Sequence, residues 1–367
     1  MRRTPGVDDL QRWRRIGSVP EPERMLAVRL SRAAAEGSPE GTLRRVTGGS
    51  VDWSRVVEAA RALRTVPLLD ATLVRHSDRL EIPGKERKTL WMEADAWRRW
   101  NRRLAAEGER VVAALEREGY RVVPIKGFDY ARRLYPDVGL RPMVDIDLLL
   151  PERELGPACE FLKGTLEYRE EDSPAERRHG RTYHKRILFR WEGDESRCLD
   201  MHAVFYHREL YPVDYEELWR RIGDGRAGLE PEDCLLLSCL ILAKDRYQTD
   251  LRDMLDIHLM IRSCNLDWSV VLERAREWEV SVALFFSLLV VRNILGSAVP
   301  ARVLEKCRPG WLRRSWLELF LATDRIPVYR FDHGSFLPKM FIRLPLADSP
   351  AGWLRFLKAR IMHRVIS

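Results

Sequence analysis

Cysteine is scarce in this chain, and the cysteines that occur follow no binding pattern. The sequence has 6 cysteines in 367 residues, and no two of them form a C-x-x-C pair. Disulfide-stapled modules and zinc modules both need closely spaced cysteines. The spacing therefore argues against both classes and favours a reducing, cytoplasmic environment.

Long apolar runs are also missing. A membrane-spanning helix needs about 20 consecutive apolar residues, and the longest candidate, Val280 to Leu295, is interrupted by Arg292 and Asn293. The arginine-rich N-terminus lacks the apolar stretch of a secretory signal. We therefore expect a globular protein with no transmembrane segment, in which residues 280–295 form a buried helix.

Several well-known catalytic signatures are absent as well. The chain has no Walker A loop, no G-x-S-x-G turn, no H-E-x-x-H pair and no glycine fingerprint for dinucleotides. It also shows no internal repeat and no low-complexity tract. Any chemistry must therefore come from a less familiar arrangement of polar residues.

Positive charge exceeds negative charge, but it is not concentrated. The chain has 63 Lys and Arg against 55 Asp and Glu, a formal net charge of +8. Basic residues are mixed with acidic ones along the expected helices, and no pure basic tract marks a nucleic-acid surface. A nucleotide fits this balance, and a nucleic-acid partner is an alternative that is not favoured.

The secondary-structure signals change twice along the chain and predict an α+β protein. Strands alternate with helices over residues 106–225, and helical periodicity dominates on both sides of that segment. We predict a mixed-sheet core at 106–225, an N-terminal helical region at 1–105, a helical bundle at 226–300 and a C-terminal helical extension at 301–367. The expected strands are 121–125, 145–150, about 183–191 and 198–205, and the main expected helices are about 88–118, 128–134, 152–162, 214–221, 232–247, 251–263, 268–278 and 280–295.

The segment from Gly352 to Met362 is basic and amphipathic. Such a helix either docks its apolar face on the body of its own protein or lies on a membrane surface. Docking is the favoured interpretation, and peripheral membrane contact is the weaker alternative.

The sequence RPMVDIDLLL at 141–150 places two carboxylates at the head of an apolar run. Side chains alternate between the two faces of a strand, so Asp145 and Asp147 point the same way while Ile146 enters the core. Two carboxylates on one face repel each other, and a hard divalent cation such as Mg²⁺ relieves that repulsion. The pattern predicts a metal site.

A second polar feature lies upstream, at the end of the expected strand 121–125. Lys126 and Gly127 follow that strand and precede the expected helix 128–134. A glycine at such a turn lets backbone N–H groups approach a phosphate at the N-terminus of a helix. Together with the carboxylates, this turn suggests a metal-dependent site for a nucleoside triphosphate.

These residues resemble a known family. IKG at 125–127, LYPD at 134–137, the 141–150 block, LDMH at 199–202 and LRDMLDI at 251–257 resemble the uncharacterised bacterial nucleotidyltransferase family of the DNA polymerase beta-like nucleotidyltransferase superfamily. The resemblance covers roughly residues 105 to 300. The chain departs from the commoner superfamily pattern, which has Gly-Ser or Gly-Gly at the turn and often a serine before the first aspartate.

The resemblance implies a nucleotidyltransferase fold and a two-metal reaction. Asp145, Asp147 and Asp200 would ligate Mg²⁺, or Mn²⁺ in its place, and transfer a nucleoside monophosphate (NMP) from a nucleoside triphosphate (NTP) such as ATP to a hydroxyl acceptor. Lys126 and Gly127 would lie near the triphosphate. The remaining two assignments stay open: Arg141 approaches the phosphates or pairs with a carboxylate, and His202 orients the metal site or is a structural histidine.

Three further questions stay open at this point. Asp253 or Asp256 is either a base supplied by the helical bundle or a salt-bridge partner. The acceptor is a small molecule or natural-product intermediate in the leading interpretation, with a toxin-like transfer to tRNA as an alternative. A retained fold does not guarantee retained chemistry, so a degenerate nucleotide-binding or scaffold protein is the non-enzymatic alternative.

Overall fold

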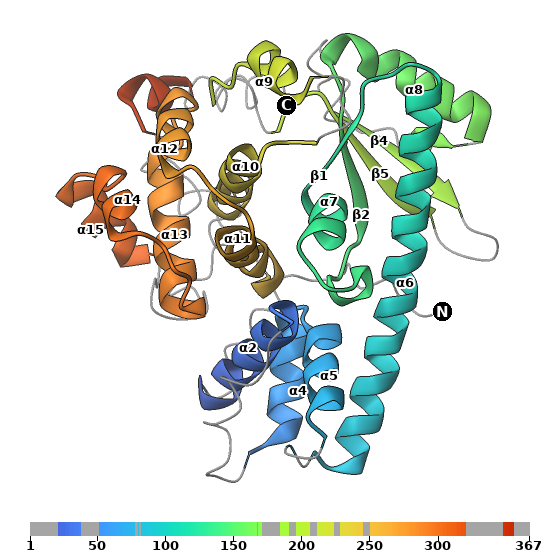
Figure 1. Cartoon of the computed structure of the whole chain (residues 1–367), viewed down its shortest axis with the longest axis vertical. Coiled ribbons are helices and arrows are strands. Elements are labelled where there is room, and N and C mark those ends of the chain that lie inside the picture. Colours follow the sequence, from blue (N-terminus) through green and yellow to red (C-terminus); the bar gives the residue numbers. More distant parts are fainter. Residues whose placement is uncertain are drawn as a thin grey trace.

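The computed structural model describes residues 21–37, 51–77, 80, 82–166, 168–170, 184–190, 196–205, 211–223, 228–244, 250–320 and 348–355. Within these ranges the fold is α+β, as the sequence predicts, with one small mixed sheet among many helices. Figure 1 shows the sheet between a long helix on one side and a group of helices on the other.

The sheet has the strand order β1-β2-β5-β4-β3. Its central strand β2 pairs antiparallel with β1 and parallel with β5. All four expected strands are present, and the short β3 is an addition that the sequence analysis did not foresee. The bounds are β1 Val123–Ile125, β2 Asp145–Leu149, β3 Arg169–Glu170, β4 His184–Arg190 and β5 Ser196–His202.

The two faces of β2 belong to different apolar cores. Ile146 and Leu148 join a cluster with buried residues of α6 and α8, while Leu149 joins a larger cluster to which the N-terminal part of α6 and many other helices contribute. This alternation is the period of two that a strand with both faces covered requires. The helices nearest the sheet are α6 Gly84–Arg117, α7 Lys126–Arg133 and α8 Glu152–Leu166.

The larger core joins helices from both ends of the chain. N-terminal helices pack with the helices that follow the sheet, and buried residues of this cluster extend from Ala27 to Leu317. Figure 1 shows α6 running from the N-terminal helices up to the sheet, so that it links the two regions. The bounds are α2 Glu21–Ala35, α4 Trp53–Ala62, α5 Val66–Arg75, α9 Tyr215–Ile222, α10 Pro231–Lys244, α11 Leu251–Ser263, α12 Trp268–Glu277, α13 Ser281–Leu295, α14 Ala301–Lys306 and α15 Trp311–Phe320.

Side-chain caps explain several of the helix starts. The carboxylates of Asp52, Asp214 and Asp267 accept backbone N–H bonds from the first turns of α4, α9 and α12, which satisfies donors that have no partner inside the helix. Pro231 opens α10, where its fixed φ is favourable. The starts predicted from the sequence for α9, α10 and α12 lie within one residue of those observed.

The expectation for the exposed side of α6 needs a correction. Helical periodicity over residues 88–118 predicts that the buried side includes Trp91, Leu104, Val111, Val112 and Leu115. Leu104, Val111 and Leu115 are buried, but Val112 is half-buried and Trp91 is 53% exposed. Helical spacing alone cannot separate a tryptophan at the edge of an apolar stripe from one at its centre, because neighbouring packing decides which is covered.

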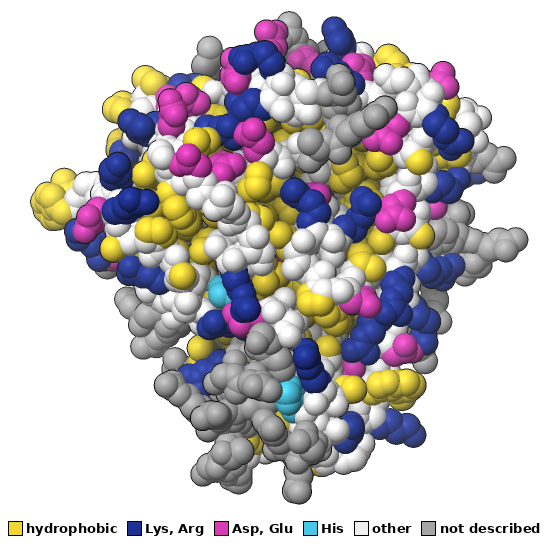
Figure 2. Space-filling model, in the orientation of Figure 1, with side chains coloured by type: hydrophobic (Ala, Val, Ile, Leu, Met, Phe, Trp, Pro, Cys, Tyr) yellow, Lys and Arg dark blue, Asp and Glu magenta, His cyan; other side chains and the backbone are white. Residues whose placement is uncertain are grey.

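Two sequence predictions concern membranes. None of the helices within the described ranges is long and apolar enough to cross a bilayer, and α13 is a buried helix as expected. The amphipathic segment 352–362 lies outside the described residues from 356 onward, so its docking stays a prediction. On the face shown in Figure 2, basic and acidic side chains lie interspersed among hydrophobic and uncharged ones.

Candidate metal centre

A pocket of about 330 Å³ lies between the sheet and the helices α10 and α11. The sheet side of this pocket carries Asp145, Asp147 and Asp200, and the turn after β1 adds Lys126 and Gly127. The helical side consists of Leu237, Ser238, Leu240 and Ile241 from α10 and Arg252, Asp253 and Asp256 from α11, and Arg141 also lines the pocket.

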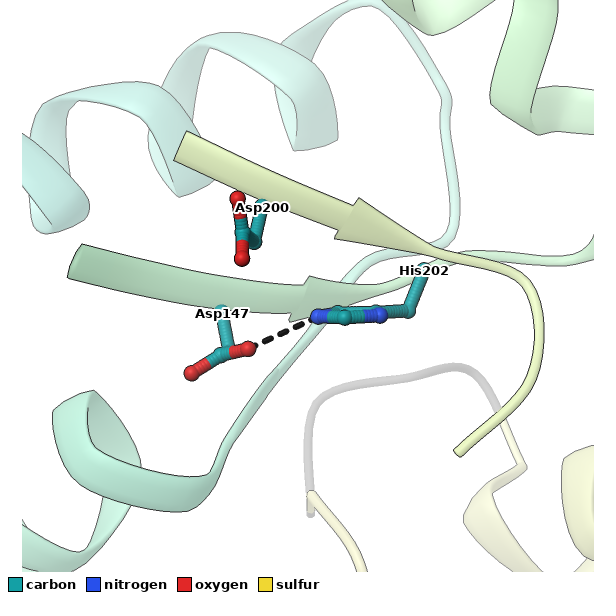
Figure 3. A group of neighbouring side chains, drawn as sticks. All are labelled: Asp147, Asp200 and His202. Atoms are coloured by element: carbon teal, nitrogen blue, oxygen red, sulfur yellow. Dashed lines mark hydrogen bonds and ion pairs between the residues drawn. The ribbon is translucent and has the colours of Figure 1, made fainter. Parts of the chain in front are cut away.

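The register of the sheet brings the carboxylates together. β2 and β5 run parallel, and Asp147 is directly opposite Asp200. Asp145 lies two residues before Asp147 on the same strand, and therefore on the same face. Ligand atoms of Asp147, Asp200 and His202 all lie within 4.8 Å of one another. Figure 3 shows the two carboxylates side by side, with the imidazole directed at Asp147.

His202 contacts the central carboxylate directly. Its Nε2 lies 2.7 Å from Oδ1 of Asp147, and it donates there in the tautomer that carries its proton on Nε2. Both side chains are buried. This contact fixes the orientation of Asp147, which is the supporting arrangement often found behind metal ligands.

Lys126 contacts the same oxygen, next to His202. Its Nζ donates to Oδ1 of Asp147 at 2.5 Å and lies 3.2 Å from Nε2 of His202. Burial disfavours the charged amine, but the charge and hydrogen bond of Asp147, together with the charges of Asp145 and Asp200, outweigh this effect, and the pKa of Lys126 is raised. The sequence analysis placed Lys126 near phosphates and did not foresee this contact.

The backbone at Lys126 is held in an uncommon conformation. Its φ is +55°, in the left-handed region that costs a residue with a Cβ roughly 1–2 kcal/mol. Lys126 directly follows Ile125, which pairs with Asp147 in the register of β1 and β2. The sharp turn therefore aims the amine back at the carboxylates of the neighbouring strand, and strain of this kind is common at functional sites.

The carboxylates on this side of the pocket have displaced pKa values of opposite sign. Burial, together with the negative charges of Asp147 and Asp200, raises the pKa of Asp145 to about 7. Burial acts in the same direction on Asp147, but Lys126 and the hydrogen bond from His202 prevail and hold its pKa at about 2. Clustered groups with divergent pKa values are typical of reactive sites.

The donor set fits a hard divalent cation. Mg²⁺ prefers carboxylate oxygens, and Asp145, Asp147 and Asp200 present three carboxylates to one pocket. His202 also lies within reach of a shared ion, and an imidazole is a weaker ligand for Mg²⁺ than for softer metals. The residues therefore suit Mg²⁺ or Mn²⁺, with His202 better placed as a support for Asp147.

Arg141 forms a buried ion pair with the helical bundle. Its Nε and Nη2 donate to both carboxylate oxygens of Asp256, at 2.5–3.1 Å, and Tyr135 donates to the same carboxylate at 2.9 Å. Both charged side chains are buried. Of the two roles that the sequence left open for Arg141, this geometry matches the pairing with a carboxylate, and it matches the salt-bridge role for Asp256.

The guanidinium of Arg141 explains why residue 127 is a glycine. A Cβ at Gly127 would lie 2.6 Å from Nη1 of Arg141, well inside normal contact distance. The guanidinium cannot easily move away, because its Nε and Nη2 both donate hydrogen bonds to Asp256. Close packing against Arg141 is therefore sufficient reason for the glycine, independent of any approach by phosphate.

The sequence analysis missed Arg252 as a pocket residue. Its Nη1 donates to the carbonyl oxygen of Pro142 at 2.8 Å, and Nη2 lies 3.1 Å from Asp250 Oδ2. Its neighbour Asp253 also lines the pocket, and burial raises the pKa of Asp253 to about 6. The LRDMLDI segment was noted for its aspartates, and the arginine within it was the available signal.

Comparison with protein families decides the identity. The model of a family described as uncharacterised nucleotidyltransferases matches residues 49–296, which is more than half of the chain. The chain belongs to this family. Comparison with curated proteins and with solved structures gave no match.

The extent of the family match corrects one expectation. The resemblance read from the sequence began at about residue 105, whereas the nucleotidyltransferase match begins at residue 49. It therefore includes α4, α5 and the whole of α6. These helices share the large apolar core with the bundle that lines the pocket, and they lie within the part of the chain that the family model covers.

Proposed function

We propose that this nucleotidyltransferase moves NMP from an NTP to a hydroxyl group of an acceptor, with release of pyrophosphate, and that it uses Mg²⁺ or Mn²⁺. One observation carries the proposal. In a chain of this family, Asp147 and Asp200 are directly opposite each other on parallel strands at the floor of a pocket. Asp145 adds a third carboxylate on the same face.

Each residue has a part in the proposed reaction. Asp145, Asp147 and Asp200 hold the divalent cation, which when bound offsets the negative charge of the triphosphate and polarises the α-phosphate. His202 keeps Asp147 in position through their hydrogen bond. Lys126 and Gly127, at the mouth of the turn after β1, contact the triphosphate. Arg141 holds the loop before β2 against α11 through Asp256.

The transfer itself is a substitution at phosphorus. The acceptor oxygen forms a bond to the α-phosphorus, and the bond from that phosphorus to the bridging oxygen breaks, so that pyrophosphate leaves with the electron pair. A base must accept the proton of the acceptor hydroxyl, and we expect it on the helical side of the pocket, opposite the metal-binding carboxylates. Asp253 is our assignment, because it lines that side and its pKa of about 6 lies near neutrality.

A small molecule is the favoured acceptor. On the face shown in Figure 2, Lys and Arg side chains lie among Asp and Glu side chains rather than forming one basic surface. Transfer to tRNA would favour a concentrated basic surface along the path of the nucleic acid. A natural-product intermediate or another hydroxyl-bearing metabolite fits this observation better.

Incubation with radiolabelled NTPs tests the proposal. The protein is mixed with each NTP labelled at the α-phosphate, with Mg²⁺ and a fractionated cell extract, and pyrophosphate release and label transfer are followed. We expect label in a small-molecule fraction, and none with the Asp147→Asn variant.

The same experiment separates the alternatives. Label in the RNA fraction would replace the small acceptor by tRNA or another RNA. Nucleotide binding without transfer of label to any fraction would contradict the enzymatic proposal and favour a binding or scaffold role.

A further inference from the structure

Lys126 occupies the position where a cation is needed. Its ammonium nitrogen is 2.5 Å from Oδ1 of Asp147, and that carboxylate also belongs to the group whose ligand atoms converge within 4.8 Å. A divalent ion bound to Asp147 through this oxygen would meet the ammonium at close range. Two cations cannot share one carboxylate oxygen without strong repulsion.

The charges around Lys126 show what the amine does when no metal is bound. Asp145, Asp147 and Asp200 crowd one face of the sheet, and all three stabilise the charged form of Lys126. Buried carboxylates without a nearby cation are costly to ionise. The amine offsets part of that cost and holds the strands' carboxylates in place.

The backbone supports the same interpretation. The left-handed φ of +55° at Lys126 directs its side chain toward β2, and the family's helix α7 begins at this residue. A solvated lysine would gain nothing from this strain. The conformation is stabilised by the contact that the amine makes with Asp147.

We propose that Lys126 is a built-in counter-cation that competes with the divalent metal for Asp147, so that metal entry displaces its amine toward the pocket, where it becomes available to the triphosphate. This inference rests on the proposed metal site but adds a property to it. The metal-free protein carries its own substitute for the ion, and its affinity for metal in the absence of nucleotide is reduced in return.

The competition predicts the direction of a binding change. In Lys126→Met, which removes the charge and keeps an unbranched side chain, Mn²⁺ should bind the nucleotide-free protein at least about tenfold more tightly, because one charge at contact distance in a part-buried site contributes more than that factor. The signal of free Mn²⁺ in electron paramagnetic resonance measures the affinity. The metal-free variant should also melt at a lower temperature, and Mn²⁺ should raise that temperature more than in the original protein.

Two controls isolate the effect. Lys126→Arg keeps the charge and should keep the weaker affinity. Lys163→Met removes one positive charge from α8, where Lys163 pairs with Glu160, and should leave Mn²⁺ binding unchanged. If Lys126→Met does not fold without metal, the comparison is made between Asp145→Asn and Asp145→Asn with Lys126→Met, since the first change removes one negative charge from the cluster.

The outcomes distinguish this inference from the proposed function. Equal or weaker Mn²⁺ binding in Lys126→Met overturns the competition but leaves the metal site intact. Absence of Mn²⁺ binding in both proteins overturns the competition and the metal-dependent function together. NMP transfer by the original protein, measured separately, is unaffected by the first result.

Discussion

The pocket has two walls, one formed by the sheet and one by α11 with Arg141 packed against it, and their charged side chains are arranged differently. On the helical wall, Arg141 and Asp256 form a closed, bidentate pair. On the sheet wall, three carboxylates lie together on one face, and the ammonium of Lys126 contacts Asp147. The pair of Arg141 and Asp256 satisfies its own charges, whereas the carboxylates of the sheet wall are crowded enough to raise the pKa of Asp145.

This difference separates structural from chemical polar groups. A buried pair that satisfies its own charges holds two parts of the chain together and has little left for a ligand. A crowded group with divergent pKa values, such as Asp145 and Asp147, is unfavourable by itself and gains from a bound cation. We therefore expect changes in the sheet wall to affect activity, and loss of the Arg141–Asp256 pair to affect stability.

The largest effect is expected from the sheet wall. Asp147→Asn should reduce NMP transfer by more than about 10⁴-fold, over 5 kcal/mol, because the cation that stabilises the developing charge loses its central ligand. Initial rates with α-labelled NTP measure the loss. Unchanged circular dichroism would show that folding is intact, and residual transfer within tenfold of the original would contradict the role of the sheet wall.

Loss of the buried pair between Arg141 and Asp256 should lower the stability of the fold. Arg141→Met should lower the free energy of unfolding by about 3–5 kcal/mol, because it leaves the carboxylate of Asp256 buried without its cation. Denaturant unfolding measures the change. The exposed pair of Arg61 and Glu93 provides the control: Glu93→Gln should lower stability by less than about 1 kcal/mol. Similar losses in both variants would contradict the prediction that the buried pair contributes more to stability than the exposed one.

Adding a methyl group at Gly127, which packs against Arg141, should also lower stability. Gly127→Ala should lower the free energy of unfolding by about 1–3 kcal/mol, because the added Cβ collides with the pinned guanidinium of Arg141. Gly164→Ala, in α8 with open space around the added methyl, should be neutral or stabilising by up to about 1 kcal/mol. In an Arg141→Met background the cost at Gly127 should largely disappear, and full additivity of the two changes would refute the collision.

The smallest expected effect is on the stability of the metal-free protein, which the crowded carboxylates lower as they ionise. The folded-state pKa of Asp145 is raised to about 7 from a usual value of 3.8, so the folded protein binds a proton that the unfolded chain has released between those values. Stability of the metal-free protein therefore falls as the pH rises from about 4 to about 7. Asp145→Asn should reduce this slope, which Asp253 shares between pH 4 and 6, and should stabilise the metal-free protein at pH 8 by about 0.5–2 kcal/mol.

Thermal unfolding in the presence of a chelator, at pH 4, 6 and 8, checks this prediction. A variant that is less stable than the original at pH 8 would show that Asp145 is not a source of strain.

Local structure was largely predictable from the sequence. The strand at Asp145–Leu149 and the capped start of α9 follow from patterns of two to four residues, namely alternation and N-cap chemistry. Asp145 and Asp147 were proposed from a D-x-D pair at a strand start, and Asp200 from the family resemblance of the LDMH segment. Such features depend on neighbours in sequence, which a single chain displays.

The partners across the fold were not predictable. The pairing of Arg141 with Asp256 joins residues 115 positions apart, and nothing local to either residue selects the other. The φ of +55° at Lys126 is equally hidden, since lysine has no preference for the left-handed region and the turn is imposed by the pairing of β1 with β2. Trp91 shows the same limit for burial.

The most direct test of the account is the location of the metal. A crystal grown with Mn²⁺ and a non-hydrolysable NTP, measured near the manganese absorption edge, should show anomalous density between Asp147 and Asp200, with Asp145 also within coordination distance and the triphosphate on the pocket side. Manganese bound elsewhere, with Lys126 still in contact with Asp147 and no nucleotide in the pocket, would contradict it.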